Sequence, residues 1–371
     1  MGSEKPAVLI IGGLGFIGRH TALYIHENNL ASELRIVDKV LPQLAWLAPE
    51  FEKACSKEHF VQADAGQEQA FPRIFDRANG KQFDYVINCA GDPRHSQPEE
   101  VYQFRNHDMS LALAKEIVKR SIPVFVESAT AMVYKSGSKP NKEDDKTAPW
   151  HNLAKWNLKV DEDLAKIPEL NWVGLRFPHV YGEYDRRYFS IGLCLARTHK
   201  FLERELEMLY SKDLKVNTVY VKDAARALWT AAEWRASKGN DSTVPNVFNV
   251  VDHNDTSQAQ IGQALSEIFD IKVSFLGTLV SQLAKLSLDD VIEELNEESL
   301  QVWAELLEEK KITRAGPISP FLEKDLIKDQ DLYIDGSLFE TTTGFKPEWP
   351  NFTVDSLRNM IASYERMGWW P

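Results

Sequence analysis

The chain has 371 residues, of which 43% are hydrophobic, so it can bury a large core and suits one large α/β domain or two domains. Its formal net charge is −12 and it has no block of Lys and Arg, which argues against nucleic acid and anionic membranes as partners. Cys55, Cys89 and Cys194 lack metal-ligand spacing, which predicts reduced thiols, no metal site and a cytoplasmic protein. The polar start MGSEKP predicts no signal peptide, and without a run of about 18 apolar residues we expect no membrane span.

The first predicted element is a buried parallel strand at Val8–Ile11, followed by a glycine turn and a helix over Arg19–Asn28. Gly12 permits the tight turn, Gly15 lets the backbone approach a pyrophosphate, and Gly18 lets the helix pack on the strand. The helix N-terminus then offers free N–H groups to phosphates. The alternative interpretation is a glycine-rich turn that binds no ligand.

A second strand is predicted at Leu34–Val37, and it leads to Asp38. A carboxylate at this point accepts both ribose hydroxyls of an adenosine and repels a 2′-phosphate, which favours NAD over NADP. Lys39, next to it, weakens that preference. The alternative for Asp38 is a solvated charge at the end of a strand.

Pro42–Cys55 has a mixed helical pattern, and a short strand at Phe60–Ala63 leads to Asp64, which either lies near the adenine ring or caps the loop. A strand at Tyr85–Ile87 is followed by Asn88-Cys89-Ala90-Gly91, a turn of small residues that can pass close to the cofactor ribose. Asn106 either lies on the surface or bonds a neighbouring strand. The remaining predictions in this half are helices at Phe71–Ala78, Val101–Lys119 and Trp150–Ala165, strands at Val124–Val126 and Trp172–Leu175, and a polar loop at Gly137–Pro149.

This alternation of strand and helix predicts an α/β fold with a Rossmann-type, doubly wound parallel sheet and a smaller C-terminal substrate-binding region. We expect residues 1–176 to form the NAD-binding domain, with further core elements from about 215–250. Residues 177–371 then form mainly the substrate-binding region, with irregular segments in which strand and helix are interleaved. Apolar residues at helical spacing predict core-facing amphipathic helices at Leu276, Leu279, Val280, Leu283, Leu286, Val291, Ile292, Leu295 and Leu300–Leu307.

Five motifs in this order resemble the extended short-chain dehydrogenase/reductase family, which includes NAD-dependent epimerases and dehydratases. They are GGLGFIG at 12–18, FVESATAMVY at 125–134, RFPHVYG at 176–182, VYVKDAA at 219–225 and GFKP at 344–347. The resemblance implies a small-molecule substrate and a homodimer built from the helices at 101–119 and 150–165. The implied cofactor-binding residues are Gly12, Gly15, Phe16, Ile17, Gly18, Asp38, Lys39, Asp64, Ala65, Cys89, Ala90, Gly91, Lys155, Phe177 and His179.

In that family a Tyr-x-x-x-Lys pair and a Ser or Thr hydroxyl carry out the chemistry, and the matching residues here are His151, Lys155 and Thr130. A histidine therefore stands in place of the tyrosine. Imidazole titrates near neutral pH, so His151 can replace the phenol as acid and base. The alternative is a site that binds NAD but has lost hydride transfer, where His151 only caps or packs.

Nucleotide-sugar enzymes of this family carry an Arg before the VYV strand, whereas no Arg lies between Arg204 and Arg226 here. The runs at 34–39 and 216–221 look more like the 3β-hydroxysteroid dehydrogenase branch, whose substrates are apolar alcohols. His179 is a second candidate proton donor or a structural histidine. Aromatic residues that either line an apolar pocket or belong to the core are Trp303, Phe321, Tyr333, Trp369 and Trp370.

These observations predict an NAD-dependent oxidoreductase that acts on an apolar alcohol or ketone. One alternative is a redox-neutral epimerase, dehydratase or cyclase with tightly bound NAD. The other is a non-catalytic, NAD-binding regulatory subunit.

Overall fold

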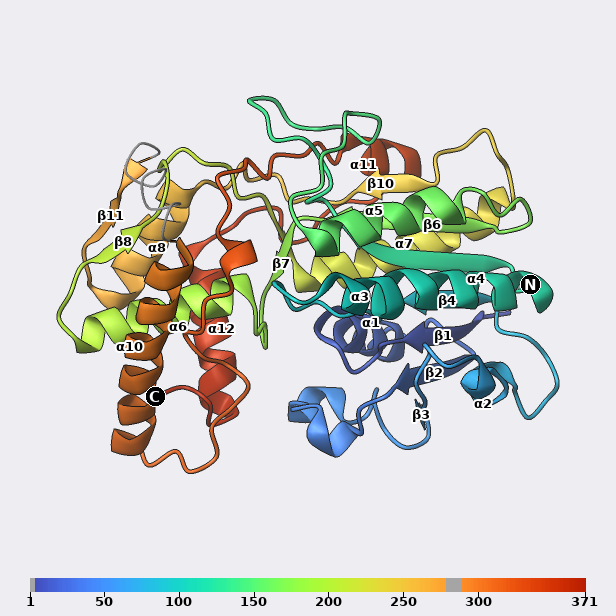
Figure 1. Ribbon diagram of the computed structural model, residues 1–371. Helices are drawn as coiled ribbons and strands as arrows, with labels where there is room; N and C mark the ends of the chain where they lie inside the picture. The colour runs from blue at the N-terminus through green and yellow to red at the C-terminus, as the bar shows by residue number, and fades with distance from the viewer. Residues whose placement is uncertain (1–3, 278–287) are drawn as a thin grey trace.

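The computed structural model describes residues 4–277 and 288–371, which form a sheet lobe and a helical lobe (Figure 1). The sheet lobe is built on seven parallel strands in the order β10-β6-β5-β4-β1-β2-β3. These strands are β1 (Ala7–Ile11), β2 (Glu33–Asp38), β3 (Phe60–Gln62), β4 (Tyr85–Asn88), β5 (Val124–Thr130), β6 (Trp172–Phe177) and β10 (Val247–Asn249). The order reverses between β1 and β4, which is the place where ligands bind in doubly wound sheets. The predicted fold class is confirmed.

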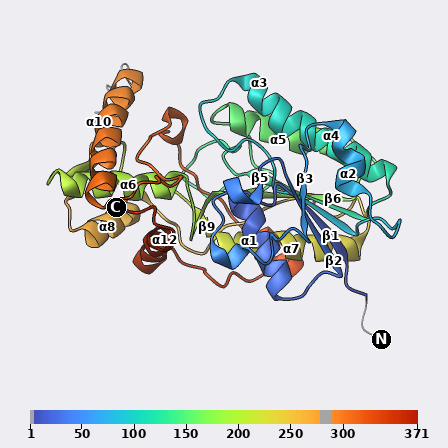
Figure 2. The ribbon, with the colours of Figure 1, turned by 90° about the horizontal axis from the view of Figure 1, so that it is seen from below.

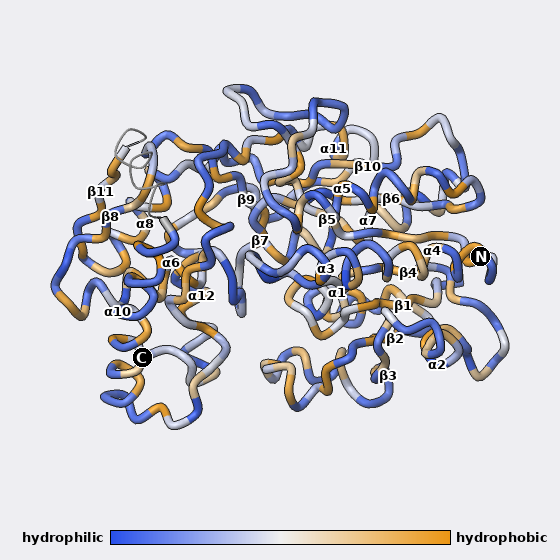
Figure 3. Tube along the Cα trace, in the orientation of Figure 1, coloured by the Kyte–Doolittle hydropathy of each residue, from blue (hydrophilic) through white to orange (hydrophobic). Residues whose placement is uncertain are grey.

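Helices cover both faces of this sheet (Figure 2). One face carries α2 (Phe71–Phe75), α3 (Glu99–Tyr102), the π-helical turn η4 (Gln103–Asp108), α4 (Met109–Lys119) and α5 (Asn152–Leu164). The other face carries α1 (Phe16–Glu27), α7 (Val221–Lys238) and α11 (Ser337–Thr343). In β1, Val8 and Ile10 pack toward the second face, and Leu9 and Ile11 pack toward the first. The strand is apolar throughout because both of its faces are buried, and Figure 3 shows it in orange.

The helical lobe lies beyond β7 (His179–Tyr181) and β9 (Thr218–Tyr220), which pair with each other between the two lobes. Its helices are α6 (Tyr188–Phe201), α8 (Gln258–Phe269), α10 (Leu288–Glu309) and α12 (Val354–Arg366), and its small sheet pairs β8 (Leu206–Met208) with β11 (Val273–Phe275). Strands and helices are interleaved after Phe177, as expected. Each helix has an apolar face, and these faces contribute to one shared core.

The prediction of core-facing amphipathic helices between Leu276 and Leu307 is confirmed in part. Ile292 and Leu306 of α10 are buried, whereas Val291 and Leu300 are exposed. The predicted positions Leu279, Val280, Leu283 and Leu286 lie outside the described residues.

Several boundaries differ from those expected. Helix α1 begins directly after Gly15, three residues earlier than predicted, because the glycine turn passes straight into the helix. Pro42–Cys55 contains only short 3₁₀ turns, η1 (Pro42–Leu44) and η2 (Pro49–Phe51), each of which starts at a proline. The remaining 3₁₀ turns are η3 (Glu68–Ala70) and η6 (Lys324–Leu326). Among the described residues, no helix is both long and apolar enough to cross a bilayer.

Candidate cofactor and substrate site

The glycine turn between β1 and α1 is closely packed against the turn after β4. Gly12 has a φ of +72°, and a Cβ at this position would lie 2.6 Å from the Cα of Ala90. Gly15 precedes the helix, and the first intrahelical bond joins the N–H of Arg19 to the carbonyl of Gly15 at 3.0 Å. The amides of residues 16–18 therefore have no partner inside the helix. This cradle, which a side chain would fill, fits the diphosphate of a dinucleotide.

Asp38 lies beside the glycine turn at the end of β2. Its Oδ2 accepts a hydrogen bond from the N–H of Leu14 at 3.1 Å, and its Oδ1 accepts one from Val40 at 3.0 Å. Burial raises the pKa of this carboxyl group above its usual value. The half-buried carboxylate is thus fixed next to the cradle, as an adenosine ribose requires. Lys39 is exposed beside it.

Asp64 caps its own loop, which was one of its two predicted roles. Its Oδ1 accepts a hydrogen bond from the N–H of Gly66 at 3.0 Å, and its Oδ2 pairs with Arg105 of η4 at 3.1 Å. Ala65, the next residue, is buried. These contacts do not assign either residue to an adenine ring, so that role stays a prediction.

The turn after β4 is fixed by side-chain hydrogen bonds. Asn88 Oδ1 accepts a hydrogen bond from the N–H of Ala90 at 3.1 Å. Asn106 is buried, and its Oδ1 accepts a hydrogen bond from the N–H of Asp92 at 2.9 Å. Asn106 therefore bonds the loop that follows β4. Gly91, with a φ of +153°, faces Asn106. Burial raises the pKa of the Cys89 thiol to about 12, which keeps it protonated.

Thr130 and His151 are linked through Met132. Thr130 is the last residue of β5, and its Oγ1 accepts a hydrogen bond from the N–H of Met132 at 3.2 Å. His151 precedes α5 and caps it, because its Nδ1 accepts a hydrogen bond from the N–H of Ala154 at 3.1 Å. Its Nε2 lies 3.4 Å from the sulfur of Met132. Burial lowers the pKa of His151 to about 4, so near pH 7 the ring is neutral and carries its proton on Nε2.

Lys155 is directed to a different neighbour. Its Nζ lies 2.6 Å from Oε1 of Glu99 in α3, and its side chain is 58% exposed. The structure therefore connects Thr130 and His151 only through Met132, and it pairs Lys155 with Glu99 at the protein surface.

Phe177 and His179 follow on the neighbouring strand. The carbonyl of Phe177 accepts a hydrogen bond from the N–H of Ala131 at 2.8 Å, which joins the ends of β6 and β5. The His179 ring stacks on Tyr188 with 4.0 Å between centroids. Burial lowers the pKa of His179 to about 3, so its ring is neutral.

A cavity of about 400 Å³ extends from His179, Met132 and Trp150 into the helical lobe. Most of its lining is aliphatic, from α6, β8, α8, α10 and residues 322–332. The aromatic residues that line it are Trp150, Tyr188, Phe189 and Tyr210. Trp303, Phe321, Tyr333, Trp369 and Trp370 are not among the residues that line this cavity. Trp303 and Trp369 belong to the core, as the alternative stated.

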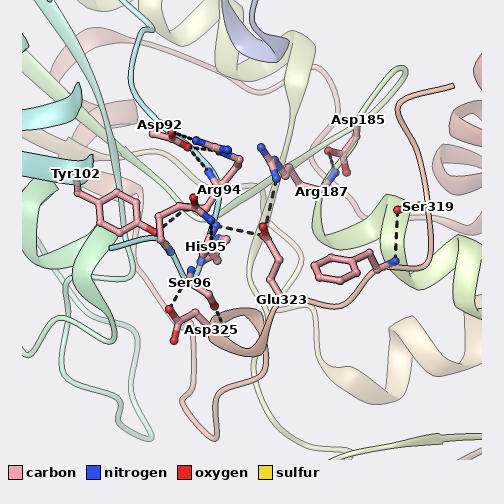
Figure 4. A network of polar contacts seen from close by, with 12 residues as sticks. Asp92, Arg94, His95, Ser96, Tyr102, Asp185, Arg187, Ser319, Glu323 and Asp325 are labelled. Atoms are coloured by element: carbon pink, nitrogen blue, oxygen red, sulfur yellow. Dashed lines mark hydrogen bonds and ion pairs between the residues drawn. The ribbon is translucent and has the colours of Figure 1, made fainter. Parts of the chain in front are cut away.

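A third histidine next to this site, His95, was not predicted (Figure 4). Its ring meets the His151 ring edge-on at 4.8 Å between centroids, and burial lowers its pKa to about 3. Glu323 accepts a hydrogen bond from the N–H of His95 at 3.2 Å, and Asp325 accepts one from Ser96 at 3.1 Å. No sequence motif marks this loop, because its partners lie more than 200 positions away in the chain.

The sheet, the glycine cradle and the acidic residue after β2 define a dinucleotide-binding protein of the Rossmann type. The model of the NAD dependent epimerase/dehydratase family matches residues 8–250, and the chain belongs to this family. The predicted family is thereby confirmed, and NAD, the predicted cofactor, is the cofactor of this family.

Relatives of known identity are distant. UDP-glucose 4-epimerase from Neisseria meningitidis (serogroup A / serotype 4A) is 26% identical over 189 residues, which are 48% of this chain and 54% of that protein. The chain thus spans about half the length of this curated relative. A UDP-N-acetylglucosamine 4-epimerase from Methanobrevibacter ruminantium M1, in complex with UDP-N-acetylmuramic acid, superposes with a TM-score of 0.64 at 18% identity and 98% and 99% coverage of the two chains. UDP-glucose 4-epimerase from Thermus thermophilus, in complex with NAD, gives 0.64 at 15% identity and 97% and 99% coverage. Identities this low establish the fold alone.

Proposed function

We propose that this protein is an NAD-dependent oxidoreductase of an apolar alcohol or ketone, similar to the 3β-hydroxysteroid dehydrogenase branch. The observation that carries the proposal is the cavity of about 400 Å³ with a mainly aliphatic and aromatic lining, which begins at His179 and Met132. Each methylene group buried in such a cavity favours binding by about 0.8 kcal/mol. An apolar ring system would gain most of its affinity there.

The charges around the cavity argue against a nucleotide sugar. Within residues 4–277 and 288–371, no arginine lines the cavity. Its two lysines are engaged, because Lys328 pairs with Asp325 at 2.9 Å and Lys215 donates to the carbonyl of Asp255 at 3.4 Å. A diphosphate is bound best by arginines that donate two parallel hydrogen bonds. The lining offers no such group.

In this proposal the glycine turn with Phe16 and Ile17 holds the cofactor diphosphate, and Asp38 and Lys39 lie at its adenosine ribose. The other proposed cofactor contacts are Asp64, Ala65, Cys89, Ala90, Gly91, Lys155, Phe177 and His179. Bound NAD would supply a hydride acceptor or, when reduced, a hydride donor.

The proposed catalytic residues are Thr130, His151 and Lys155. The Thr130 hydroxyl positions the substrate oxygen. In this proposal the Nε2–H of the neutral His151 ring gives up its contact with the Met132 sulfur for that oxygen and stabilises a carbonyl group as negative charge develops on it. Lys155 leaves Glu99 and contacts the nicotinamide ribose. Because Ala154 occupies Nδ1, the proton that the oxygen gains on reduction, or loses on oxidation, passes through Nε2 of His151.

A redox-neutral reaction with tightly bound NAD is the second candidate. The curated relatives that match are named as epimerases, which favours this alternative. The regulatory subunit is the third, and the histidine at position 151 is the feature that favours it.

Cofactor content and turnover separate these candidates. The protein is purified, denatured and assayed for released nicotinamide, and the native protein is then tested by nicotinamide absorbance with apolar alcohols and ketones and with UDP-glucose. Turnover of apolar ketones alone supports the proposal. Bound NAD that never changes its absorbance contradicts the proposal and agrees with the redox-neutral reaction or the regulatory subunit, and turnover of UDP-glucose contradicts an apolar substrate.

We further propose that residues 177–371 form mainly the substrate-binding region of a cytoplasmic protein. A homodimer through α4 and α5 is part of this proposal. Light scattering coupled to gel filtration measures the mass of the particle, and a mass of 42.3 kDa would contradict the dimer.

A further inference from the structure

Helix α6 forms one wall of the apolar cavity along most of its own length. Part of its lining follows at spacings of four, three and four positions, which places those residues on one face of the helix. They are Tyr188, Gly192, Leu195 and His199. From Tyr188 to His199 the helix rises about 17 Å, at about 1.5 Å per residue. The cavity therefore extends along most of α6.

The first end of this wall adjoins the proposed catalytic residues. Met132 and His179 line the cavity, and the His179 ring stacks on Tyr188, the first residue of α6. The N–H of Met132 donates a hydrogen bond to Thr130, and its sulfur contacts Nε2 of His151. A substrate oxygen that reaches these groups thus lies at the Tyr188 end, and the rest of the substrate points along α6.

The wall that faces α6 is apolar. Helix α6 packs against α8 and α10 in the helical lobe (Figure 1). These two helices contribute mainly aliphatic side chains to the lining, namely Ile261, Leu265, Val291, Ile292 and Leu295. A ligand that fills the cavity must therefore present apolar surface along most of its length.

Gly192 lies in the middle of α6, where its backbone is ordinary helix without a positive φ. A Cβ at this position would meet no heavy atom of the described residues within 4 Å. The other glycines inside the described helices differ, because a Cβ at Gly18 would overlap the carbonyl of Gly12, and one at Gly262 the ring of Phe275. Glycine is the least favourable helix residue apart from proline. The open space at Gly192 thus exists at a cost in helix stability, which indicates room for a ligand.

The length of the cavity favours an extended chain. Carbon–carbon bonds of about 1.5 Å at tetrahedral angles advance such a chain by about 1.25 Å per bond, so about 13 bonds span the distance from Tyr188 to His199. A compact ring system would occupy only part of this length. The remaining apolar wall would then lack the van der Waals contacts that a chain makes with it.

We propose that the substrate is an aliphatic alcohol or ketone with an extended chain of about 13 carbons, which runs over Gly192 toward His199. This inference rests on the proposed function and narrows its substrate class. Gly192 is then a specificity-determining residue, because a side chain at this position enters the space of the chain.

The test compares ketones of different length and shape. 2-Hexanone ends short of Gly192, which lies about 6 Å along α6 from Tyr188, whereas 2-undecanone extends past it. 1-Tetralone is a compact bicyclic ketone. Binding of each to the NAD-loaded full-length protein is measured by ligand-observed NMR for the wild type, Gly192→Leu and Gln263→Leu. Gln263 is the control, because it is exposed on α8 and is not among the residues that line the cavity.

We expect the wild type to bind 2-undecanone at least 100-fold more tightly than 2-hexanone, because each methylene buried in an apolar cavity adds about 4-fold. In Gly192→Leu this preference should fall at least 10-fold, whereas Gln263→Leu should keep it. An unchanged preference in Gly192→Leu overturns the path of the chain over Gly192.

1-Tetralone separates this inference from the proposed function. A wild type that binds 1-tetralone but shows no preference for the longer chain overturns the extended substrate and leaves the apolar ketone in place. Failure of all three ketones to bind the wild type overturns the proposed apolar substrate and, with it, the inference.

The folding of Gly192→Leu is checked by its melting temperature and its affinity for NAD. Gly192→Ala is measured beside it and decides the question if Gly192→Leu does not fold. Alanine is the better helix former, so this variant should melt at a higher temperature and still prefer 2-undecanone less than the wild type does. The wild-type preference in every folded variant, together with a raised melting temperature of Gly192→Ala, would show that the space at Gly192 holds no substrate and would contradict the proposal.

Discussion

The imidazole of His151 caps helix α5, because its Nδ1 accepts a hydrogen bond from the N–H of Ala154 at 3.1 Å. Asn is a good N-cap residue and Ala is a poor one. We therefore expect His151→Ala to lose about 1 kcal/mol of unfolding free energy, and His151→Asn to keep most of it. Both should lose turnover at least 10-fold, since neither retains the Nε2–H that faces Met132. Urea denaturation and the turnover assay measure the two effects separately.

Turnover of His151→Asn at the wild-type rate would show that the imidazole only caps the helix.

Lys155 and Lys159 lie one helical turn apart in α5 and provide a matched pair. Lys155 pairs with Glu99, and Lys159 forms an ion pair with Asp163. Exposed ion pairs contribute at most about 1 kcal/mol, so either can open at little cost. We expect Lys155→Met to bind NAD about 10-fold more weakly and Lys159→Met to bind it like the wild type, as measured by calorimetry. Equal affinities in both variants would show that Lys155 does not reach the cofactor.

The parts of the site that the sequence predicted are those formed by neighbours in the chain. Strand β1, the glycine turn and Asp38 follow one another within one crossover, so spacing alone places them. The cap formed by His151 was one of its predicted roles, but the start of α5 at Asn152 was not predicted. The apolar pattern of residues 150–165 does not show where the helix begins.

The parts that could not be predicted depend on contacts between distant segments. Glu323 meets His95 across 228 positions, and no local pattern indicates such a contact. The cavity lining has the same origin, because it is assembled from several helices that pack only in the folded chain. Trp303 and Trp369 were compatible with both a pocket and the core, and their packing places them in the core.

Gly12 and Gly80 have nearly the same backbone angle but different surroundings. Their φ values are +72° and +70°, yet a Cβ at Gly12 would lie 2.6 Å from Ala90, whereas nothing lies within 4 Å at Gly80. Alanine at either position costs about 1–2 kcal/mol for the left-handed conformation. We expect Gly12→Ala to lose clearly more stability than Gly80→Ala and to abolish NAD binding, as followed by thermal melts with and without NAD. Stabilisation of Gly12→Ala by NAD would contradict a cofactor cradle at this turn.

Glu127 makes stability depend on pH in a predictable direction. It lies buried on strand β5, where Asn88 donates to its two oxygens at 3.1 and 2.9 Å and Ser110 donates at 3.0 Å, and burial raises its pKa to about 8. Below its unfolded pKa of about 4.3 both states are protonated. Between about 4.3 and 8 the unfolded chain releases this proton and the folded protein keeps it, so stability falls as pH rises, by at most about 1.4 kcal/mol per unit. We expect Glu127→Gln to remove this slope and to gain stability over the wild type from pH 5 to 8, whereas the exposed control Glu52→Gln keeps the wild-type slope. Urea denaturation across this range measures the difference in unfolding free energy between the wild type and Glu127→Gln. Taking this difference also cancels the opposing effect of the buried histidines, which is the same in both proteins. Parallel plots of unfolding free energy against pH for the two proteins would contradict a protonated Glu127.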